Sequence, residues 1–167
     1  MINNKLLLVA GAATLSASVF STGAFAASAT GNASATVLEP LAITAGAGMD
    51  FGDVAGDADN ATTVSLSSGG IATAGTGANA SGSPAAGVFN VTGEDTLAYD
   101  ITLPTSTLLT GGGGADMTVN GFTDSEGGSA SLVAGSGTFN VGAVLNINAG
   151  QGAGNYTGTY SVIVEYQ

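Results

Sequence analysis

The sequence contains no Cys, no His and no Trp, and only one Lys or Arg among its 167 residues. These absences remove the usual general bases, thiol nucleophiles, Schiff-base amines, and nitrogen or sulfur metal ligands. Carboxylates, hydroxyls and amides are what remain for chemistry. Most classes of enzyme are excluded on this ground, so we expect a protein that is not an enzyme and carries no cofactor.

Positive charge is equally scarce. Twelve Asp and Glu residues face a single basic side chain, and the formal net charge is -11. Nucleic-acid phosphates and anionic lipid head groups are bound by clustered Lys and Arg, so we expect no nucleic-acid partner. Without Cys, stability must come from backbone hydrogen bonds and an apolar core, because no disulfide can form.

Long apolar runs are absent except near the start of the chain. Lys5 lies in a short polar opening, an apolar stretch follows from Leu6 to about Phe20, and residues 24–26 form an A-x-A cleavage site. The apolar stretch is diluted by Ser and Thr and is shorter than the roughly 20 residues of a membrane span. We therefore expect a signal peptide over residues 1–26, removed on secretion, and no membrane insertion of the mature chain.

The rest of the chain has the pattern of short β-strands. Apolar and polar residues alternate with period two between turns rich in Gly, Ser, Asp and Asn, and no stretch shows helical spacing. Residues 97–103 alternate in this way until Pro104, which lacks a donor for a strand ladder. The closing stretch places Tyr160, Val162 and Val164 on one face. We expect this face to be buried.

Eight or so such strands predict an all-β fold, an antiparallel immunoglobulin-like β-sandwich that forms a single domain over residues 38–167. The Gly-rich residues 69–87 and 111–114 read as loops. The other predicted strands cover residues 41–44, 62–68, 87–93, 116–122, 137–141 and 144–149.

Residues 27–37 alternate strictly between small apolar residues and hydroxyl or amide residues. We expect an N-terminal strand whose thin apolar face lies along a sheet already formed, in this molecule or in a neighbouring one, since strand addition between molecules is a known recognition mode. An ordinary first strand or a loose terminus is the simpler interpretation. The apolar face comprises Ala29, Gly31, Ala33, Ala35 and Val37.

Acidic residues offer the other candidate sites. Asp50, Asp53, Asp57 and Asp59 supply hard oxygen ligands that calcium prefers, but their spacing lacks the loop ending in a bidentate Glu, so a solvated acidic turn is the favoured interpretation. Carboxylate pairs also occur at residues 94–95 and 124–126. Glycosidase chemistry needs such a pair, but the chain has no Trp and few other aromatic residues to hold a sugar.

Two passages carry a resemblance to known proteins. The first is PLAITAGAGMDFGDV at residues 40–54, with a Phe-Gly turn, and the second is GNYTGTYSVIVEYQ at residues 154–167, where Gly-x-Tyr opens the closing strand. GVFNVTG and YDITLP follow in order between them. The chain resembles an uncharacterised family of secreted bacterial domains with an immunoglobulin-like fold and, more loosely, spore-coat-U-type and chaperone-usher pilin subunits.

The resemblance implies a β-sandwich that a Gram-negative bacterium exports through the periplasm to its surface or surroundings. By analogy with the pilins it also implies fibres joined by donated strands, although the Cys pair of the pilins is missing.

Two functions of different classes remain at this stage. The first is a secreted, non-enzymatic structural subunit of a surface filament or extracellular matrix, a homo-oligomer or fibre joined by strand addition. In that function residues 27–37 donate a strand to a groove bounded by Tyr160, Val162 and Val164. The alternative is a monomeric binding module for a surface polysaccharide or for calcium, using the loops around residues 50–59 and 124–126.

Overall fold

The computed structural model describes residues 26–167. The predicted signal peptide lies outside the described residues apart from Ala26. The described chain divides after Ala35 into an N-terminal segment and a domain of residues 36–167. Between residues 26 and 167 no helix is long and apolar enough to cross a membrane.

The domain consists of antiparallel strands, and the all-β class predicted from the sequence is confirmed. Thirteen strands are found in the described residues rather than about eight. Their bounds are β1 Ala42–Ala45, β2 Asp53–Ala55, β3 Thr62–Leu66, β4 Ala72–Ala74, β5 Asn79–Ser81, β6 Gly87–Thr92, β7 Ala98–Thr102, β8 Ser106–Gly111, β9 Met117–Asp124, β10 Ser129–Ser131, β11 Ser136–Ile147, β12 Tyr156–Thr157 and β13 Ile163–Tyr166.

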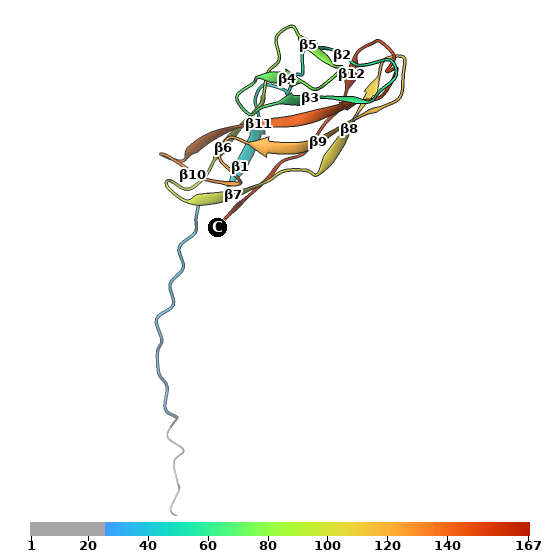
Figure 1. Cartoon of the computed structure of the whole chain (residues 1–167). Coiled ribbons are helices and arrows are strands. Elements are labelled where there is room, and N and C mark those ends of the chain that lie inside the picture. Colours follow the sequence, from blue (N-terminus) through green and yellow to red (C-terminus); the bar gives the residue numbers. More distant parts are fainter. Residues whose placement is uncertain (1–25) are drawn as a thin grey trace, which may run out of the picture. The chain divides into compact units, whose positions relative to one another are not determined.

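The strands form one large sheet and two small ones. The large sheet has the order β1-β6-β11-β9-β8-β12, and β3 joins it by pairing with both β11 and β4. The small sheets are β10-β7-β13 and β2-β5. The result is an antiparallel β-sandwich, in which β11 runs through the middle of the domain (Figure 1).

Strand β11 holds the sandwich together because it changes partners along its length. One edge of β11 pairs with β6 over residues 136–141 and with β3 over residues 143–147. The other edge of β11 pairs with β9 on both sides of this change of partner. Its inward side chains therefore enter two core clusters. The first contains Phe51, Val64, Leu66, Met117, Val119, Ala143, Leu145 and Ile147. The second contains Phe89, Val91, Tyr99, Ile101, Leu132, Phe139 and Val141.

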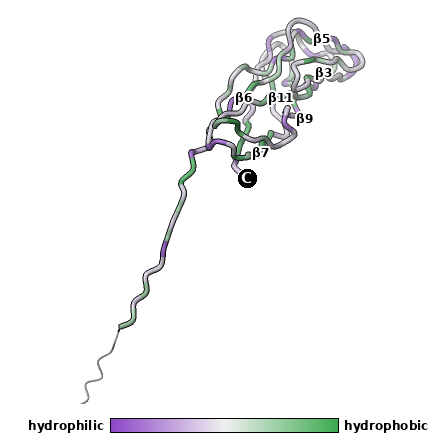
Figure 2. The backbone as a smooth tube through the Cα atoms, turned by 90° about the vertical axis from the view of Figure 1, so that its left-hand side faces the viewer, coloured by the Kyte–Doolittle hydropathy of each residue, from purple (hydrophilic) through white to green (hydrophobic). Residues whose placement is uncertain are grey.

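The structure corrects two expectations about strands and leaves a third, the strand at residues 27–37, as a prediction. The predicted strands at residues 137–141 and 144–149 are parts of the single strand β11. The Gly-rich residues 69–87 are not one loop, because they contain β4 and β5, whose small residues pair with β3 and β2. Residues 27–37 belong to no strand, and all of them are exposed. Hydropathy along these residues shows no continuous hydrophilic stretch (Figure 2).

Candidate strand-acceptor seam

Two segments of the domain follow the same side of the sandwich without pairing with each other. Residues 41–54 contain β1 and β2, and residues 154–166 contain β12 and β13. At one end β1 lies close to β13, and at the other end residues 48–54 face residues 154–158 across a pocket. No backbone hydrogen bond joins the two segments within the described chain. We call the space between them the seam.

Each segment has an unpaired backbone edge along the seam. Strand β1 pairs only with β6, and β13 pairs only with β7. Each ladder continues past its strand, since the Gly46 N–H donates to the Val88 carbonyl (2.8 Å) and the Gln167 N–H donates to the Ala98 carbonyl (3.2 Å). Alternate residues of an antiparallel strand direct their backbone groups to opposite sides. Half of the N–H and C=O groups of β1 and β13 therefore lack a strand partner.

Apolar side chains line this side of the second core cluster. The sequence alternation correctly placed Tyr160, Val162 and Val164 on the inward face, whereas Ser161 and Ile163 are exposed. The Tyr160 ring contacts two aromatic rings of the domain, with centroid distances of 5.8 Å to Phe89 and 5.3 Å to Phe122. Burial raises the pKa of the Tyr160 hydroxyl. The partly buried apolar residues of the two segments that pack on this cluster are Leu41, Ile43, Met49, Tyr160, Val162, Val164 and Tyr166.

A small hydrogen-bond network fixes the point at which the chain enters the domain. The Tyr166 hydroxyl accepts from the Glu94 N–H (2.6 Å) and donates to the Glu39 carbonyl (3.0 Å). The Glu39 N–H donates to Glu94 Oε2 (2.9 Å). Sequence reasoning treated Glu94 only as half of a carboxylate pair and missed this role. The network holds Glu39 beside the C-terminal end of β13.

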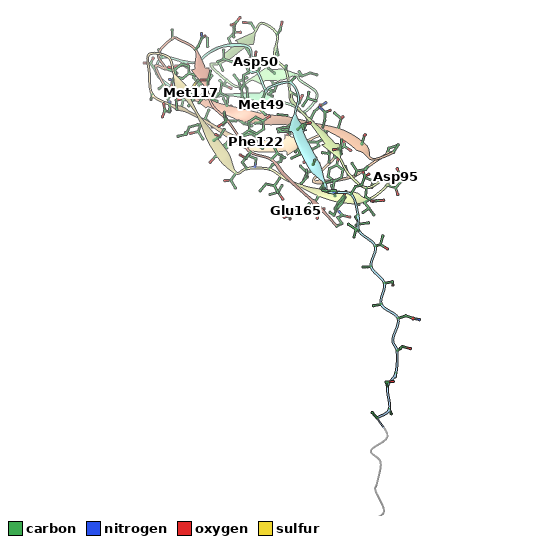
Figure 3. The ribbon with its side chains drawn as sticks, turned by 180° about the vertical axis from the view of Figure 1, so that it is seen from behind. Met49, Asp50, Asp95, Met117, Phe122 and Glu165 are labelled. Atoms are coloured by element: carbon green, nitrogen blue, oxygen red, sulfur yellow. The ribbon has the colours of Figure 1, made fainter. Side chains whose placement is uncertain are left out.

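The opposite end of the seam opens into a pocket with a cavity volume of about 790 Å³. Its walls are residues 48–54 and 154–158. Leu109, Met117 and Leu145, from three strands of the large sheet, form an apolar floor, and Phe51 adds to it. Asp50 and Met117 lie toward one end of the domain and Glu165 and Asp95 toward the other (Figure 3). The pocket and the Glu39 network thus lie at opposite ends of the seam.

The four candidate calcium ligands are not gathered into one site. Asp50 and Asp53 line the pocket. Asp57 closes a turn, since its Oδ1 accepts from the N–H groups of Asp59 (2.8 Å) and Asn60 (3.0 Å), and these bonds lower the pKa of the Asp57 carboxyl. No group of three or more acidic side chains in residues 26–167 has an arrangement that could hold a metal ion.

The other acidic candidates also serve turns. Asp124 Oδ1 accepts from the N–H groups of Glu126 (2.8 Å) and Gly128 (3.1 Å). Glu126 accepts from the hydroxyl of Ser125 (3.0 Å). These carboxylates shape a loop and do not face each other across a cleft as a glycosidase pair does.

The candidate donor face of Ala29, Gly31, Ala33, Ala35 and Val37 is exposed throughout. Val37 is 92% exposed, and the neighbouring Leu38 is 47% exposed. Large apolar side chains are costly to leave in water, and burial of such a side chain contributes about 1.5–3 kcal/mol. Among residues 27–38, these two therefore have the most to gain from a partner.

A family model described as "Domain of unknown function (DUF4402)" matches residues 41–166, which include both segments that bound the seam. No curated protein and no solved structure matches the chain.

Proposed function

We propose that this chain, which belongs to the DUF4402 family, is a secreted, non-enzymatic structural subunit of a bacterial surface filament or extracellular matrix. The seam is the observation that carries the proposal. Two unpaired strand edges flank a row of partly buried apolar side chains, and such edges readily pair with another chain. Soluble proteins commonly cover or shorten such edges.

The mechanism is strand addition between copies. Residues 27–37 of one copy form a strand whose backbone groups bond to the seam of the next copy, while small side chains face the apolar row. Eleven residues extend about 36 Å at about 3.3 Å per residue, and residues 154–166 are thirteen, so the donated strand is no longer than the segment beside which it would lie. The resemblance to pilin subunits supports the same mechanism by analogy.

Deletion of residues 27–37 tests this function. We expect the shortened chain to stay folded, because all thirteen strands lie at or after Ala42, and to lose the ability to form polymers. Circular dichroism checks the fold, and electron microscopy with analytical ultracentrifugation checks the polymers. Polymers that persist after the deletion would refute the donor role.

A matched pair of substitutions tests whether assembly depends on the donor face or on any part of residues 27–37, which we call the strip. Ala33→Asp places a charge on the face that packs against the seam, and Ser34→Asp places the same charge on the opposite face. We expect only Ala33→Asp to block assembly, because a carboxylate buried without a partner is costly. Equal effects of the two variants would show that general charge repulsion, rather than the donor face, governs assembly.

The pocket favours a second candidate function, a monomeric binding module. Its volume of about 790 Å³ falls within the range of small-ligand sites, about 300–1,000 Å³, and two carboxylates line it. Calorimetry of the full chain with calcium, and separately with surface polysaccharide, distinguishes the two functions. Measurable binding together with a strictly monomeric protein would favour the module.

A further inference from the structure

The pocket lies open between the two segments that bound the seam. Its floor is almost inaccessible to solvent, with Met117 at 4% and Phe51 at 8% exposure, yet the space between its walls measures about 790 Å³. Ala and Gly side chains are far too small to occupy such a space. Among residues 27–38, only Val37 and Leu38 carry larger aliphatic side chains.

The charge distribution selects the same occupant. All twelve carboxylates of the chain lie between Glu39 and Glu165, and residues 27–38 carry no charged side chain. Asp50 and Asp53 line the pocket, so an approaching acidic surface is repelled. Residues 27–38 can therefore approach the pocket without a charged side chain of their own.

Residues 27–38 cannot reach the pocket of their own domain, because they are attached at the other end of the seam. Glu39 is held at the Tyr166 end of the seam by hydrogen bonds to Tyr166 and Glu94. Val37, two residues away, reaches at most about 7 Å from Glu39. Residues 41–48 lead from that end to the nearest pocket wall, and eight extended residues cover about 26 Å. Val37 can reach the pocket only in a second copy.

We propose that Val37 of one copy, which lies on the same strand face as Ala33 and Ala35, occupies the pocket of the next copy and fixes the direction of the donated strand. With Val37 at the pocket and Ala27 at the Tyr166 end, residues 27–37 run parallel to residues 41–54 and antiparallel to residues 154–166 of the acceptor. The donor domain then lies at the pocket end, and the acceptor's own strip leaves from the opposite end. Copies therefore stack head to tail.

This inference rests on the proposed function, so its test must separate the two. The chain has no Cys, which allows single cysteines to report on contacts between copies. A Val37→Cys chain is mixed with a Thr157→Cys chain at the pocket wall or, as the matched control, with a Gln167→Cys chain at the other end. One partner carries a mass tag, and the mixed disulfide is detected on a non-reducing gel.

We expect a mixed disulfide with Thr157→Cys at least about tenfold more abundant than with Gln167→Cys, because disulfides form only between Cα atoms within about 7 Å. Preferential cross-linking to Gln167→Cys would overturn the proposed direction and leave strand addition intact. Assembly without either cross-link would overturn the pocket contact alone. A chain that stays monomeric would overturn both the inference and the proposed function.

A second pair of variants tests the pocket contact without cysteine chemistry. Val37→Asp puts a charge on the side chain assigned to the pocket, and Thr36→Asp puts one on the opposite face of the same strand. We expect Val37→Asp to weaken assembly by about tenfold or more, since the added charge would meet the apolar floor of the pocket and the two carboxylates, Asp50 and Asp53, that line it. Thr36→Asp should change assembly much less, and equal losses would overturn the contact.

Discussion

Each of the four tyrosines packs its side chain against a glycine from another part of the domain. A Cβ atom on the glycine would overlap the tyrosine or come within 2.8 Å of it. The pairs are Tyr99 with Gly137, Tyr156 with Gly112, Tyr160 with Gly87, and Tyr166 with Gly93. Three of these tyrosines, Tyr156, Tyr160 and Tyr166, border the seam. The glycines thus provide space for the rings that close this side of the core.

Gly93→Ala tests this packing at the seam. The added methyl group would overlap the Tyr166 hydroxyl and press on Leu41, so we expect a loss of about 1–3 kcal/mol in the free energy of unfolding, as for other overpacked sites. Urea denaturation measures it. Gly48→Ala is the control, because no heavy atom lies within 4 Å of its Cβ position, and an equal loss in both variants would contradict the packing argument.

The same packing gives the fold a dependence on alkaline pH. Burial raises the pKa of Tyr160, and burial together with the negative charge of Glu126 raises the pKa of Tyr99. A raised pKa means that folding favours the neutral phenol, so this stability is fully present below pH about 10 and is lost as pH rises through the folded-state values.

We expect the melting temperature of the natural sequence to fall above pH about 10. The melting temperature of Tyr160→Phe should fall less steeply, since Phe keeps the ring and cannot ionise. Calorimetry across pH 8–11, with ultraviolet absorbance to follow tyrosinate, measures both. Parallel curves for the two proteins would exclude Tyr160 as a contributor.

At the scale of elements, the joint in β11 is the critical position of the sandwich. Gly142 lies where the strand leaves β6 and begins to pair with β3, next to an irregularity in its register with β9. A Cβ atom there would collide with backbone atoms of Leu66, Ser67 and Ser68, which cannot move as a side chain can. Ordinary residues are therefore excluded from the joint.

Gly142→Ala should destabilise both core clusters together, because both take side chains from β11. We expect a loss of about 1–3 kcal/mol or more with a single unfolding transition. Hydrogen exchange of amides in β6 and in β3 measures the two halves separately. A loss of protection in only one half would show that the clusters are independent folding units.

The sequence predicted the elements whose inward residues are large and apolar. Alternation located β3, β6, β7, β9 and the inward face of the closing strand, because one side of each meets the core. It missed β2, β4, β5 and β10, which are three residues each and made mostly of small or polar residues. It also missed the edge strand β8 and the two-residue β12. Their pairing depends on partners distant in sequence, which a local pattern cannot show.

The candidate site, too, could be predicted from the sequence only in part. The inward face of Tyr160, Val162 and Val164 follows from alternation alone. The pocket does not, since its floor and walls come from segments as far apart as Phe51 and Tyr156. The hydrogen bonds that hold Glu39 also escape the sequence, because Tyr166 and Glu94 are 72 residues apart.

For the whole molecule, charge governs how copies approach one another. The formal net charge is -11, and every carboxylate lies in the domain rather than in residues 27–38. Two such domains repel over a distance set by ionic strength, with a Debye length of about 10 Å at 0.1 M salt and about 30 Å at 0.01 M. The contact that we propose between the uncharged strip and the seam involves no ion pair, so salt has no attraction to screen.

We therefore expect assembly to strengthen as sodium chloride rises from about 0.01 to 0.15 M, because screening removes repulsion between domains and leaves strand pairing intact. Light scattering of the full chain at fixed pH measures the effect. A variant with Asp95 and Asp100 changed to Asn, both exposed, should assemble at lower salt because it carries less charge. Assembly that weakens steadily with added salt would mean that ion pairs join the copies, which would contradict an uncharged donor strand.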